Sequence, residues 1–250
     1  MRAGFRIEDA SLTHVGVVRS ENEDSHVSLP QAGIWVVADG MGGAHDGRFA
    51  AQTIADSVAA VEPADDLELA CERVAAAIHA ANARIFARSR ELGKQMGSTV
   101  VALIVHGGEF VVMWAGDSRA YLYRDGALIP LTRDHTMVEG MVERGLLTTA
   151  EAADHPMRHI LARAVGVQET LEVDAIRDTI VTKDLFLLCS DGLHGVLADD
   201  EIAAILGEDR HAAGDKLVSA CLERGAPDNV TVTLVAASEP TLLALSGTAP

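Results

Sequence analysis

The chain has 250 residues, of which 48% are hydrophobic, enough for one domain with a sizeable core. Its formal net charge is −17, from 37 acidic residues against 20 Lys and Arg. Nucleic acids and anionic membrane surfaces bind basic faces, so this balance argues against both as partners.

In chain order, the first half predicts two strands and two helices. One strand covers residues 6–19, and a polar loop at 21–24 follows it. A second strand, at about 33–38, ends at Asp39. Apolar residues at helical spacing then predict one helix between Phe49 and Val61 and a longer one over 67–92.

The middle of the chain is rich in strands. Four are predicted, over residues 99–105, 109–114, 119–123 and 127–131. Their separators are Gly107-Gly108, Gly116-Asp117 and Asp125-Gly126. Such pairs are typical of hairpin turns, so we expect consecutive strands to pair antiparallel.

Residues 134–164 carry short helical patterns broken by Gly145 and Pro156, and we expect a mobile flap there. Later elements are strands at 171–176 and 184–189, helices at 198–206 and 212–224, and a strand after Asn229. Residues 238–250 have no pattern and are expected to form a frayed tail. No linker or repeat divides residues 1–250, so we expect a single domain with an ordered core over about 6–237.

The alternation of strand-rich and helix-pair segments predicts an α+β fold. Two antiparallel sheets would pack into a central β-sandwich, flanked by pairs of helices in a four-layer αββα arrangement, with the flap attached. Three cysteines without metal-ligand spacing, Cys71, Cys189 and Cys221, favour a reducing compartment. No apolar stretch reaches membrane-spanning length and the N-terminus is unlike a signal peptide, so we expect a cytoplasmic protein.

Carboxylates adjoin three apolar runs. Residues 34–38 lead into Asp39-Gly40, residues 185–190 lead into Asp191-Gly192, and Asp228-Asn229 precedes the run 230–236. A single Asp-Gly is most often a turn. Three such strand ends from distant parts of the chain predict acids gathered for hard divalent cations. The glycines at 40–43 would let the backbone approach a ligand and leave the Gly40 carbonyl free to coordinate it.

These motifs, in this order, resemble the metal-dependent (type 2C) protein Ser/Thr phosphatases, and the chain looks like a compact bacterial member. The resemblance covers about residues 6–237 and is carried by Arg19, Asn22-Glu23-Asp24, Asp39-Gly40-Met41-Gly42-Gly43, Gly97-Ser98-Thr99, Gly116-Asp117-Ser118-Arg119, Ser190-Asp191-Gly192-Leu193 and Asp228-Asn229.

The resemblance implies a phosphoric monoester hydrolase that acts on phosphoserine and phosphothreonine in proteins through a metal-bridging water or hydroxide. Two Mn²⁺ or Mg²⁺ ions are implied. Asp39 would bridge both ions, the Gly40 carbonyl would complete one site, and Asp191 and Asp228 would hold the other. Arg19 would bind the substrate phosphate. With Asp39 and Asp191, it forms the implied catalytic set.

Other roles follow from the same resemblance. Glu23 and Asp24 would act through metal-bound waters, with Asn229 beside them. Asp117 would join Asp191 at a third, weaker metal site, and His159 from the flap is its candidate additional ligand. The alternatives are ordinary ones: Arg19 in a surface ion pair, Asp117 in a hairpin turn and His159 exposed on the flap.

Two departures from the family pattern concern residues expected at the catalytic centre. Met41 stands where some relatives have a histidine proposed as general acid, and Gly195 stands where many have an Asp at the third metal. Two other functions are alternatives: a catalytically silent module that binds phosphoproteins, and a two-metal nuclease, against which the net charge argues. The expected partners are phosphorylated proteins and a cognate Ser/Thr kinase, with no nucleic acid or membrane, and we expect a monomer. Some compact members regulate type VI secretion.

Overall fold

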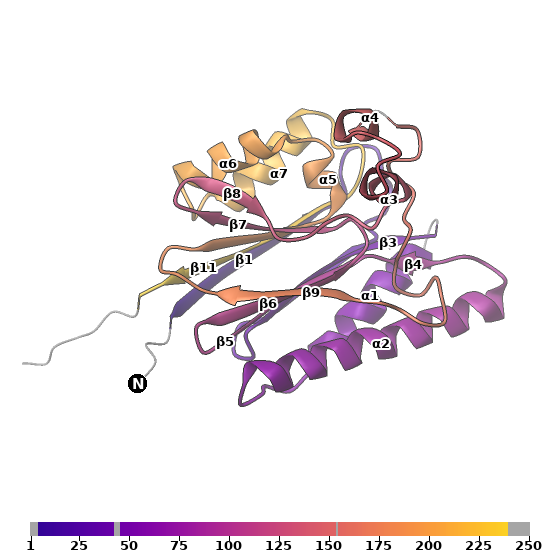
Figure 1. Cartoon of the computed structure of the whole chain (residues 1–250), viewed down its shortest axis with the longest axis horizontal. Coiled ribbons are helices and arrows are strands. Elements are labelled where there is room, and N and C mark those ends of the chain that lie inside the picture. Colours follow the sequence, from indigo (N-terminus) through magenta and orange to yellow (C-terminus); the bar gives the residue numbers. More distant parts are fainter. Residues whose placement is uncertain (1–4, 43–45, 154, 240–250) are drawn as a thin grey trace, which may run out of the picture.

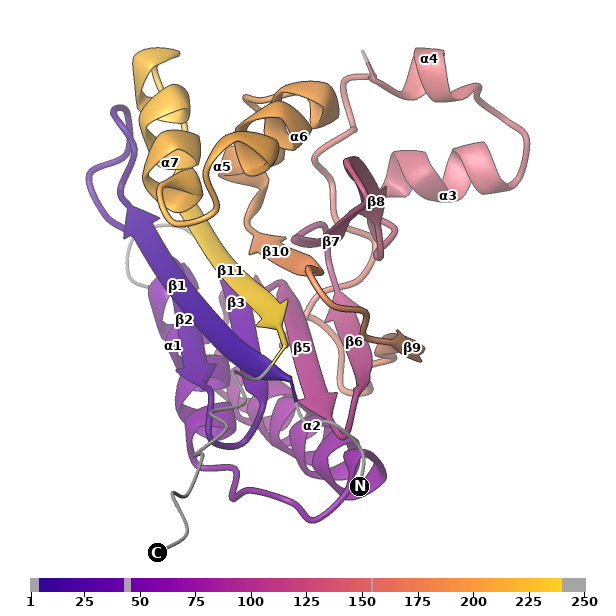
Figure 2. The same ribbon diagram turned by 90° about the vertical axis from the view of Figure 1, so that its left-hand side faces the viewer.

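The structure is a computed structural model that describes residues 5–42, 46–153 and 155–239. Gly43 and nearly all of the expected tail at 238–250 therefore lie outside the described residues. Two β-sheets pack face to face, and helices cover both outer faces (Figures 1 and 2). This arrangement confirms the predicted α+β sandwich of two antiparallel sheets flanked by helices.

Each sheet is antiparallel between all its neighbouring strands. The first sheet contains, in spatial order, β1 (Arg6–His14), β11 (Val230–Ser238), β10 (Leu185–Cys189), β7 (Arg119–Arg124) and β8 (Ala127–Pro130). The second contains β2 (Asp24–Leu29), β3 (Ile34–Met41), β5 (Val100–His106), β6 (Glu109–Ala115) and β9 (Asp174–Thr179), with the short β4 (Gly97–Ser98) beside the end of β3.

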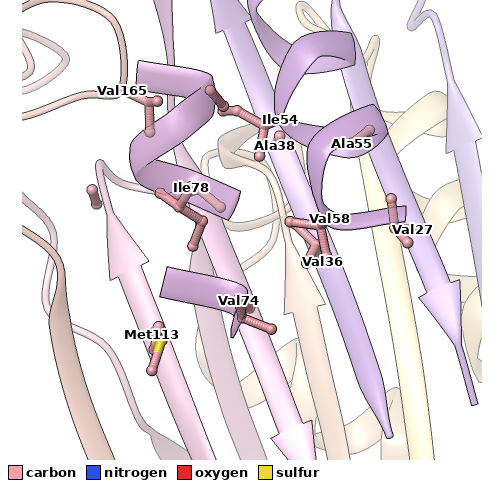
Figure 3. Close-up of a cluster of buried hydrophobic side chains, with 14 of the residues drawn as sticks. Val27, Val36, Ala38, Ile54, Ala55, Val58, Val74, Ile78, Met113 and Val165 are labelled. Atoms are coloured by element: carbon pink, nitrogen blue, oxygen red, sulfur yellow. The ribbon is translucent and has the colours of Figure 1, made fainter. Parts of the chain in front are cut away.

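Helices α1 (Asp46–Ala59) and α2 (Leu67–Leu92) cover the outer face of the second sheet. Figure 3 shows Val58 of α1 and Val74 of α2 directed to the same apolar layer as Val36 of β3. The bounds predicted for α2 agree with the structure. Asp66 caps its start by accepting from the Leu69 N–H at 2.8 Å, and Gly93 ends it in the left-handed region with φ 63°.

Helices α5 (Asp191–His194), α6 (Asp199–Glu208) and α7 (Ala213–Glu223) cover the first sheet. The space between the sheets is filled by large apolar side chains of both inner faces, including Trp35, Phe110 and Phe186. The rings of Phe110 and Phe186 meet edge to face with centroids 4.8 Å apart. The order of layers is therefore helix, sheet, sheet, helix. No helix in the described ranges is long and apolar enough to cross a membrane.

The flap segment contains α3 (Met137–Glu143) and α4 (Thr149–Ala153) and projects from one end of the sandwich (Figure 2). Thr136 caps α3 by accepting from the Glu139 N–H at 3.1 Å. Both stems of the flap meet at the sandwich, because the Ala162 N–H donates to the His135 carbonyl at 2.8 Å and the His135 N–H donates to the Gly116 carbonyl, just after β6, at 2.9 Å.

Four sequence predictions about the strands were wrong. The first strand ends at His14, so Arg19 lies in a loop, and β2 begins at Asp24 where only a loop was expected. The strand expected at 171–176 runs instead from Asp174 to Thr179. Gly116-Asp117 is not a hairpin turn, because β6 pairs with β5 and β9 whereas β7 pairs with β10 and β8. This pair therefore carries the chain from one sheet to the other.

Candidate active site

A cleft of about 1210 Å³ lies between the strand ends of the sandwich and the flap. Every predicted site residue except Asp24 lines it: Arg19, Glu23, Asp39, Gly40, Asp117, His159, Asp191, Asp228 and Asn229. Asp24 is buried next to it, directly opposite Asp39 in the β2–β3 ladder. The structure therefore brings together residues that are almost the whole chain apart in sequence.

Asp39 is fixed by the strand that carries it. Its backbone N–H donates to Thr99 Oγ1 at 3.0 Å, and its carbonyl accepts from the Thr99 N–H at 2.8 Å. The hydroxyl of Thr99 lies 2.6 Å from that of Ser118, in the crossover that also holds Asp117. A shared hydrogen-bond network thus orients Asp39 and the Asp117 segment together.

The next residue, Gly40, is where β3 meets the start of α1. A Cβ atom added there would lie 2.1 Å from the Gly47 carbonyl oxygen and 2.8 Å from that of Glu23. Only glycine allows this close approach of two backbone segments. The approach brings Glu23 beside the first turn of α1, and a Cβ on Gly47 would lie 2.8 Å from Glu23 Oε1.

Asp191 enters the cleft from the opposite sheet. It is the first residue of α5, immediately after Ser190 at the end of β10. The Ser190 hydroxyl donates to Asp24 Oδ2 at 2.8 Å and accepts from the Thr231 N–H at 3.0 Å. Ser190 therefore connects the end of the first sheet to the carboxylate that begins β2.

Arg19 and Asp228 lie together on another side of the cleft, where Arg19 Nη2 donates to Asp228 Oδ2 at 2.7 Å. Asn229 holds the loop that carries Arg19. Its Oδ1 accepts from the Glu23 N–H at 2.8 Å, and its Nδ2 donates to the carbonyls of Val15 and Glu21 at 2.8 and 2.9 Å. Asn229 thus fixes both arms of the loop between β1 and β2.

The carboxylates of this cleft oppose one another's ionisation. Burial, followed by repulsion from Asp24 and Asp191, raises the pKa of Asp39 well above its ordinary value. Burial also raises the pKa of Asp24 to about 6 and that of Asp117 to about 7. The pKa of Asp191 is raised by burial and by Asp228. A positive charge placed among these carboxylates would offset both the cost of burying their ionised forms and their mutual repulsion.

Two further observations show that the side chains of the cleft suit a divalent cation. Glu23 Oε1 and Asp24 Oδ1 are buried in the described structure without a hydrogen-bond partner, which is costly unless a ligand or ion satisfies them. The candidate donors for the two principal ions are all oxygens, as Mg²⁺ and Mn²⁺ prefer.

The described residues nonetheless contain no preassembled set of three or more His, Cys, Asp or Glu side chains for one ion. Asp228 is turned to Arg19, and carboxylates without a cation between them repel one another. An ion held by Asp228 would share this carboxylate with Arg19 or displace the arginine, and the Gly40 carbonyl would supply an additional oxygen.

Asp117 is buried in the crossover between the sheets and not in a hairpin turn, the alternative for this residue. Nε2 of His194 in α5 lies 3.0 Å from the Asp117 carbonyl oxygen, so a proton on Nε2 donates to it. His194 thereby ties the Asp117 segment to the helix that begins with Asp191. His159 is exposed on the flap, and it also borders the cleft.

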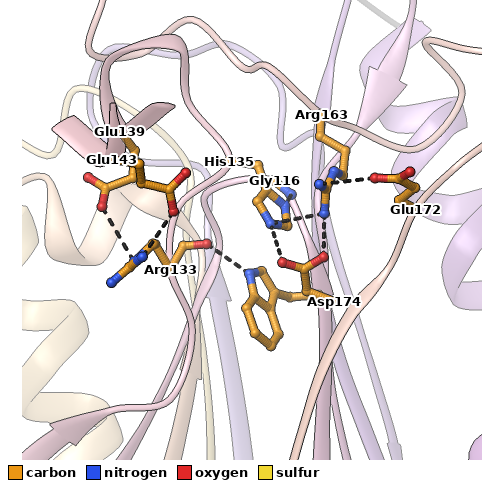
Figure 4. Close-up of polar contacts among 9 residues, drawn as sticks. Gly116, Arg133, His135, Glu139, Glu143, Arg163, Glu172 and Asp174 are labelled. Carbon is orange, nitrogen blue, oxygen red and sulfur yellow. Dashed lines mark hydrogen bonds and ion pairs between the residues drawn. The ribbon is translucent and has the colours of Figure 1, made fainter. Parts of the chain in front are cut away.

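The two flap stems meet in a polar cluster (Figure 4). His135 Nδ1 accepts from the Gly116 N–H at 3.2 Å, so a neutral His135 carries its proton on Nε2, which lies 3.1 Å from Asp174 Oδ2. Arg163, at the other stem, donates from Nη1 to Asp174 Oδ1 at 2.5 Å. The rings of Trp114 and His135 are stacked, with their centroids 5.9 Å apart. Asp174 is therefore the shared partner of both stems.

Sequence reasoning missed several residues that orient the acids. Thr99, Ser118 and Ser190 belong to motifs that were used only to identify the family, and His194 was not singled out. The available signal was a small hydroxyl beside a motif glycine or aspartate, as in Ser190-Asp191 and Asp117-Ser118. That signal is weak because Ser and Thr beside Asp or Gly are also ordinary turn residues.

Oxygen donors that converge at one end of a two-sheet sandwich, with an arginine beside them, define the class of metal-dependent phosphatases. The profile of the family described as Protein phosphatase 2C matches residues 18–228, and the chain belongs to this family.

Curated relatives agree with this assignment. Serine/threonine phosphatase Stp of Listeria innocua is 32% identical over 249 residues, which cover 94% of this chain and 95% of the relative. Serine/threonine protein phosphatase PstP of Mycobacterium tuberculosis is 36% identical over 226 residues, which cover 88% of this chain. That match covers only 43% of PstP, so the chain corresponds to less than half of that longer protein.

Solved structures share the fold over nearly the whole chain. PppA, described as a key regulatory component of T6SS in Pseudomonas aeruginosa, has a TM-score of 0.87 at 37% identity, covering 94% of this chain and 99% of PppA. The catalytic domain of PstP in complex with 2 manganese ions has a TM-score of 0.83 at 32% identity, covering 94% of this chain and 100% of that domain.

Proposed function

We propose that this chain is a metal-dependent phosphoprotein phosphatase that hydrolyses phosphoserine and phosphothreonine. The observation that carries the proposal is the convergence of Asp39, Asp191 and Asp228 from both sheets into one cleft beside Arg19. Membership of the protein phosphatase 2C family and the two manganese ions in the PstP catalytic domain support it.

In this proposal Asp39, the Gly40 carbonyl, Asp191 and Asp228 hold two Mn²⁺ or Mg²⁺ ions. When bound, the ions supply Lewis-acid charge for the attack of water on the phosphoester. Arg19 exchanges Asp228 for the substrate phosphate, which its planar guanidinium binds and orients. Glu23 and Asp24 use their unpartnered oxygens to accept hydrogen bonds from ordered water, and Asn229 keeps the Arg19 loop in place.

The experiment is hydrolysis of an aryl phosphate and of a phosphothreonine peptide with Mn²⁺, in the wild type and in Asp39→Asn and Asp191→Asn. These substitutions keep the side-chain volume and remove one ligand charge, so kcat/KM should fall by a factor on the order of 100 or more. Folding is checked by the circular dichroism of each variant. A wild type inactive with every divalent metal tested would favour the silent phosphoprotein-binding module instead.

We also propose a third, weaker ion site at Asp117 and Asp191, with His159 as a ligand from the flap. Asp117 supports it because this carboxylate is buried in the cleft, and His159 borders the same space. Calorimetric titration with Mn²⁺ should give one weak site fewer in His159→Ala than in the wild type. Equal stoichiometry would leave His159 as an exposed flap residue.

We infer that the enzyme opposes a bacterial Ser/Thr kinase in the cytoplasm and acts as a monomer whose catalytic domain is residues 6–237. The three free cysteines of the described structure are in line with a reducing compartment. Phosphoproteomes with and without the gene would identify the substrates, including any of a type VI secretion system. Light scattering of the purified protein would give the oligomeric state.

A further inference from the structure

Two exposed valines lie beside the phosphate-binding arginine. Val17 and Val18 directly precede Arg19, and they are 62% and 71% exposed. The other large apolar side chains that are exposed in the described residues do not occur as adjacent pairs: Leu92, Ile129, Met137, Leu146, Ile160 and Val181. Arg19 lines the cleft, so these two valines lie just outside it and present a small apolar platform.

The loop that carries the valines is held rigidly. The Val17 N–H donates to the Ala226 carbonyl at 3.0 Å, and Asn229 binds the carbonyls of Val15 and Glu21 on either side. Gly16 has φ 83°, and a Cβ there would lie 2.2 Å from the Asp228 carbonyl oxygen. The valines are therefore presented by a fixed backbone, so a ligand that covers them need not order the loop first.

A third apolar side chain borders the same cleft from the flap. Ile160 is 49% exposed and lines the cleft, as does Arg19. In Figure 2 the loop between β1 and β2 and the flap with α3 and α4 lie on opposite sides of the end of the sandwich. The acids of the candidate site thus have an apolar contact on each side of the opening.

We propose that Val17 and Val18 form a docking platform for the polypeptide that flanks the phosphorylated residue, with Ile160 as the opposite contact. This inference rests on the proposed phosphatase function and specifies its substrate class: phosphoserine or phosphothreonine with apolar neighbours. Apolar flanks would cover the valines. Acidic flanks would gain no such contact and would approach a chain whose net charge is −17.

A substrate segment is a better occupant of this platform than a second copy of the chain. Two valines and one isoleucine bury far less area than the roughly 1,200 Å² of a stable protein interface. Their area is enough to contact the few side chains on either side of a phosphorylated residue whose phosphate is held by Arg19. The platform is also continuous with the cleft through Arg19 itself.

The test uses the full chain and three variants with Mn²⁺. One is the double variant Val17→Ser with Val18→Ser, one is Ile160→Ser, and the control is Val181→Ser. Val181 is also an exposed valine, at 48%, but it lies between β9 and β10 at the end of the sheets remote from Asp191. Substrates are an aryl phosphate and two phosphothreonine peptides that differ only in having Val or Glu on both sides of the phosphoresidue.

Wild type should hydrolyse the Val-flanked peptide with the higher kcat/KM. The double variant should lose about fivefold in kcat/KM for that peptide, mainly through KM, because its apolar contact is removed. Its activity on the aryl phosphate and on the Glu-flanked peptide should be unchanged. Ile160→Ser should show a smaller loss of the same kind, and Val181→Ser none.

Other results would overturn the proposal. Equal losses on the aryl phosphate and on the peptide would mean that the loop affects the chemistry and not peptide binding. No discrimination between the peptides by an active wild type would remove the platform and leave the phosphatase function intact. A double variant that changes only the oligomeric state in light scattering would assign the valines to contacts between copies. A wild type inactive on all three substrates would reject the function itself.

Discussion

The residues that supply negative charge to the cleft could be predicted from the sequence, because each adjoins a buried strand. Asp39 and Asp191 end apolar runs and Asp228 precedes one, and the structure places all three in the same cleft. The residues that orient them could not be predicted in the same way. Ser190 and Thr99 act through hydrogen bonds to partners far away in sequence, and nothing local distinguishes them from turn residues.

The glycine at the end of β3 offers a test at the residue scale. Gly40→Ala should destabilise the protein by about 1–3 kcal/mol and lower Mn²⁺ affinity, since its Cβ would meet the Gly47 carbonyl oxygen at 2.1 Å. Gly140→Ala is the matched control: a Cβ there has no atom within 4 Å, and the residue lies inside α3. That change should be neutral or stabilise slightly. Urea unfolding measures the free energy of unfolding of both variants. Equal values for Gly40→Ala and Gly140→Ala would contradict the close approach at Gly40.

Asn229 offers a second test at this scale. Asn229→Ala removes three hydrogen bonds and leaves the Glu23 N–H and two carbonyls without this partner. We expect a loss of about 2–4 kcal/mol in the free energy of unfolding and faster amide exchange over residues 15–23. Hydrogen exchange followed by mass spectrometry checks the second effect. Exchange in the loop as slow as in the wild type would show that the loop is held without Asn229.

At the scale of elements, long periodic segments were predicted well, and connections between sheets were not. The bounds of α2 agree because its apolar spacing and both of its caps are local. Strand β2 was missed since it lies at a sheet edge and its sequence, Asp24 to Leu29, mixes polar and apolar residues. Gly116-Asp117 has the composition of a hairpin turn, and only the packing of two sheets decides that it crosses between them.

The flap is the element whose attachment can be tested. Asp174→Ala removes the partner that His135 and Arg163 share, so the flap stems should open more often while the sandwich stays folded. Amide exchange should become faster over residues 136–162 and stay unchanged in α2. The control is Glu172→Ala, because Glu172 contacts Arg163 through a side chain that is 86% exposed and contributes little. Identical exchange in the two variants would argue against Asp174 as the anchor.

At the scale of the whole molecule, the sandwich accumulates negative charge at one end. Carboxylates arrive there from both sheets, and each sheet alone supplies only part of the cluster. The pattern of strands and helices predicted the layers, and the strand-end acids predicted where the cluster forms. Individual side-chain contacts, such as that between Arg19 and Asp228, could not be predicted. They depend on loops whose positions are set by tertiary hydrogen bonds.

This accumulation makes stability depend on pH and metal together. In metal-free protein, the pKa values of Asp24 and Asp117 are raised to about 6 and about 7, so the native state binds more protons than the unfolded chain between about pH 4 and pH 7. The contribution of these two carboxylates to the free energy of unfolding therefore falls as pH rises through this window. Asp117→Asn cannot lose that proton, so its decline from pH 5 to pH 8 should be smaller by roughly 2–4 kcal/mol.

Divalent cations should reverse the trend, because they bind the ionised carboxylates of the native state. Added Mn²⁺ is expected to stabilise the wild type more at pH 8 than at pH 5, and to stabilise Asp39→Asn little at either pH. Urea unfolding of chelator-treated protein at both pH values, with and without Mn²⁺, measures all of these differences. Because the comparison is between variants, the titration of distant groups cancels. A wild type that is more stable at pH 8 than Asp117→Asn without metal would show that burial and the neighbouring acids do not disfavour the ionised form of Asp117.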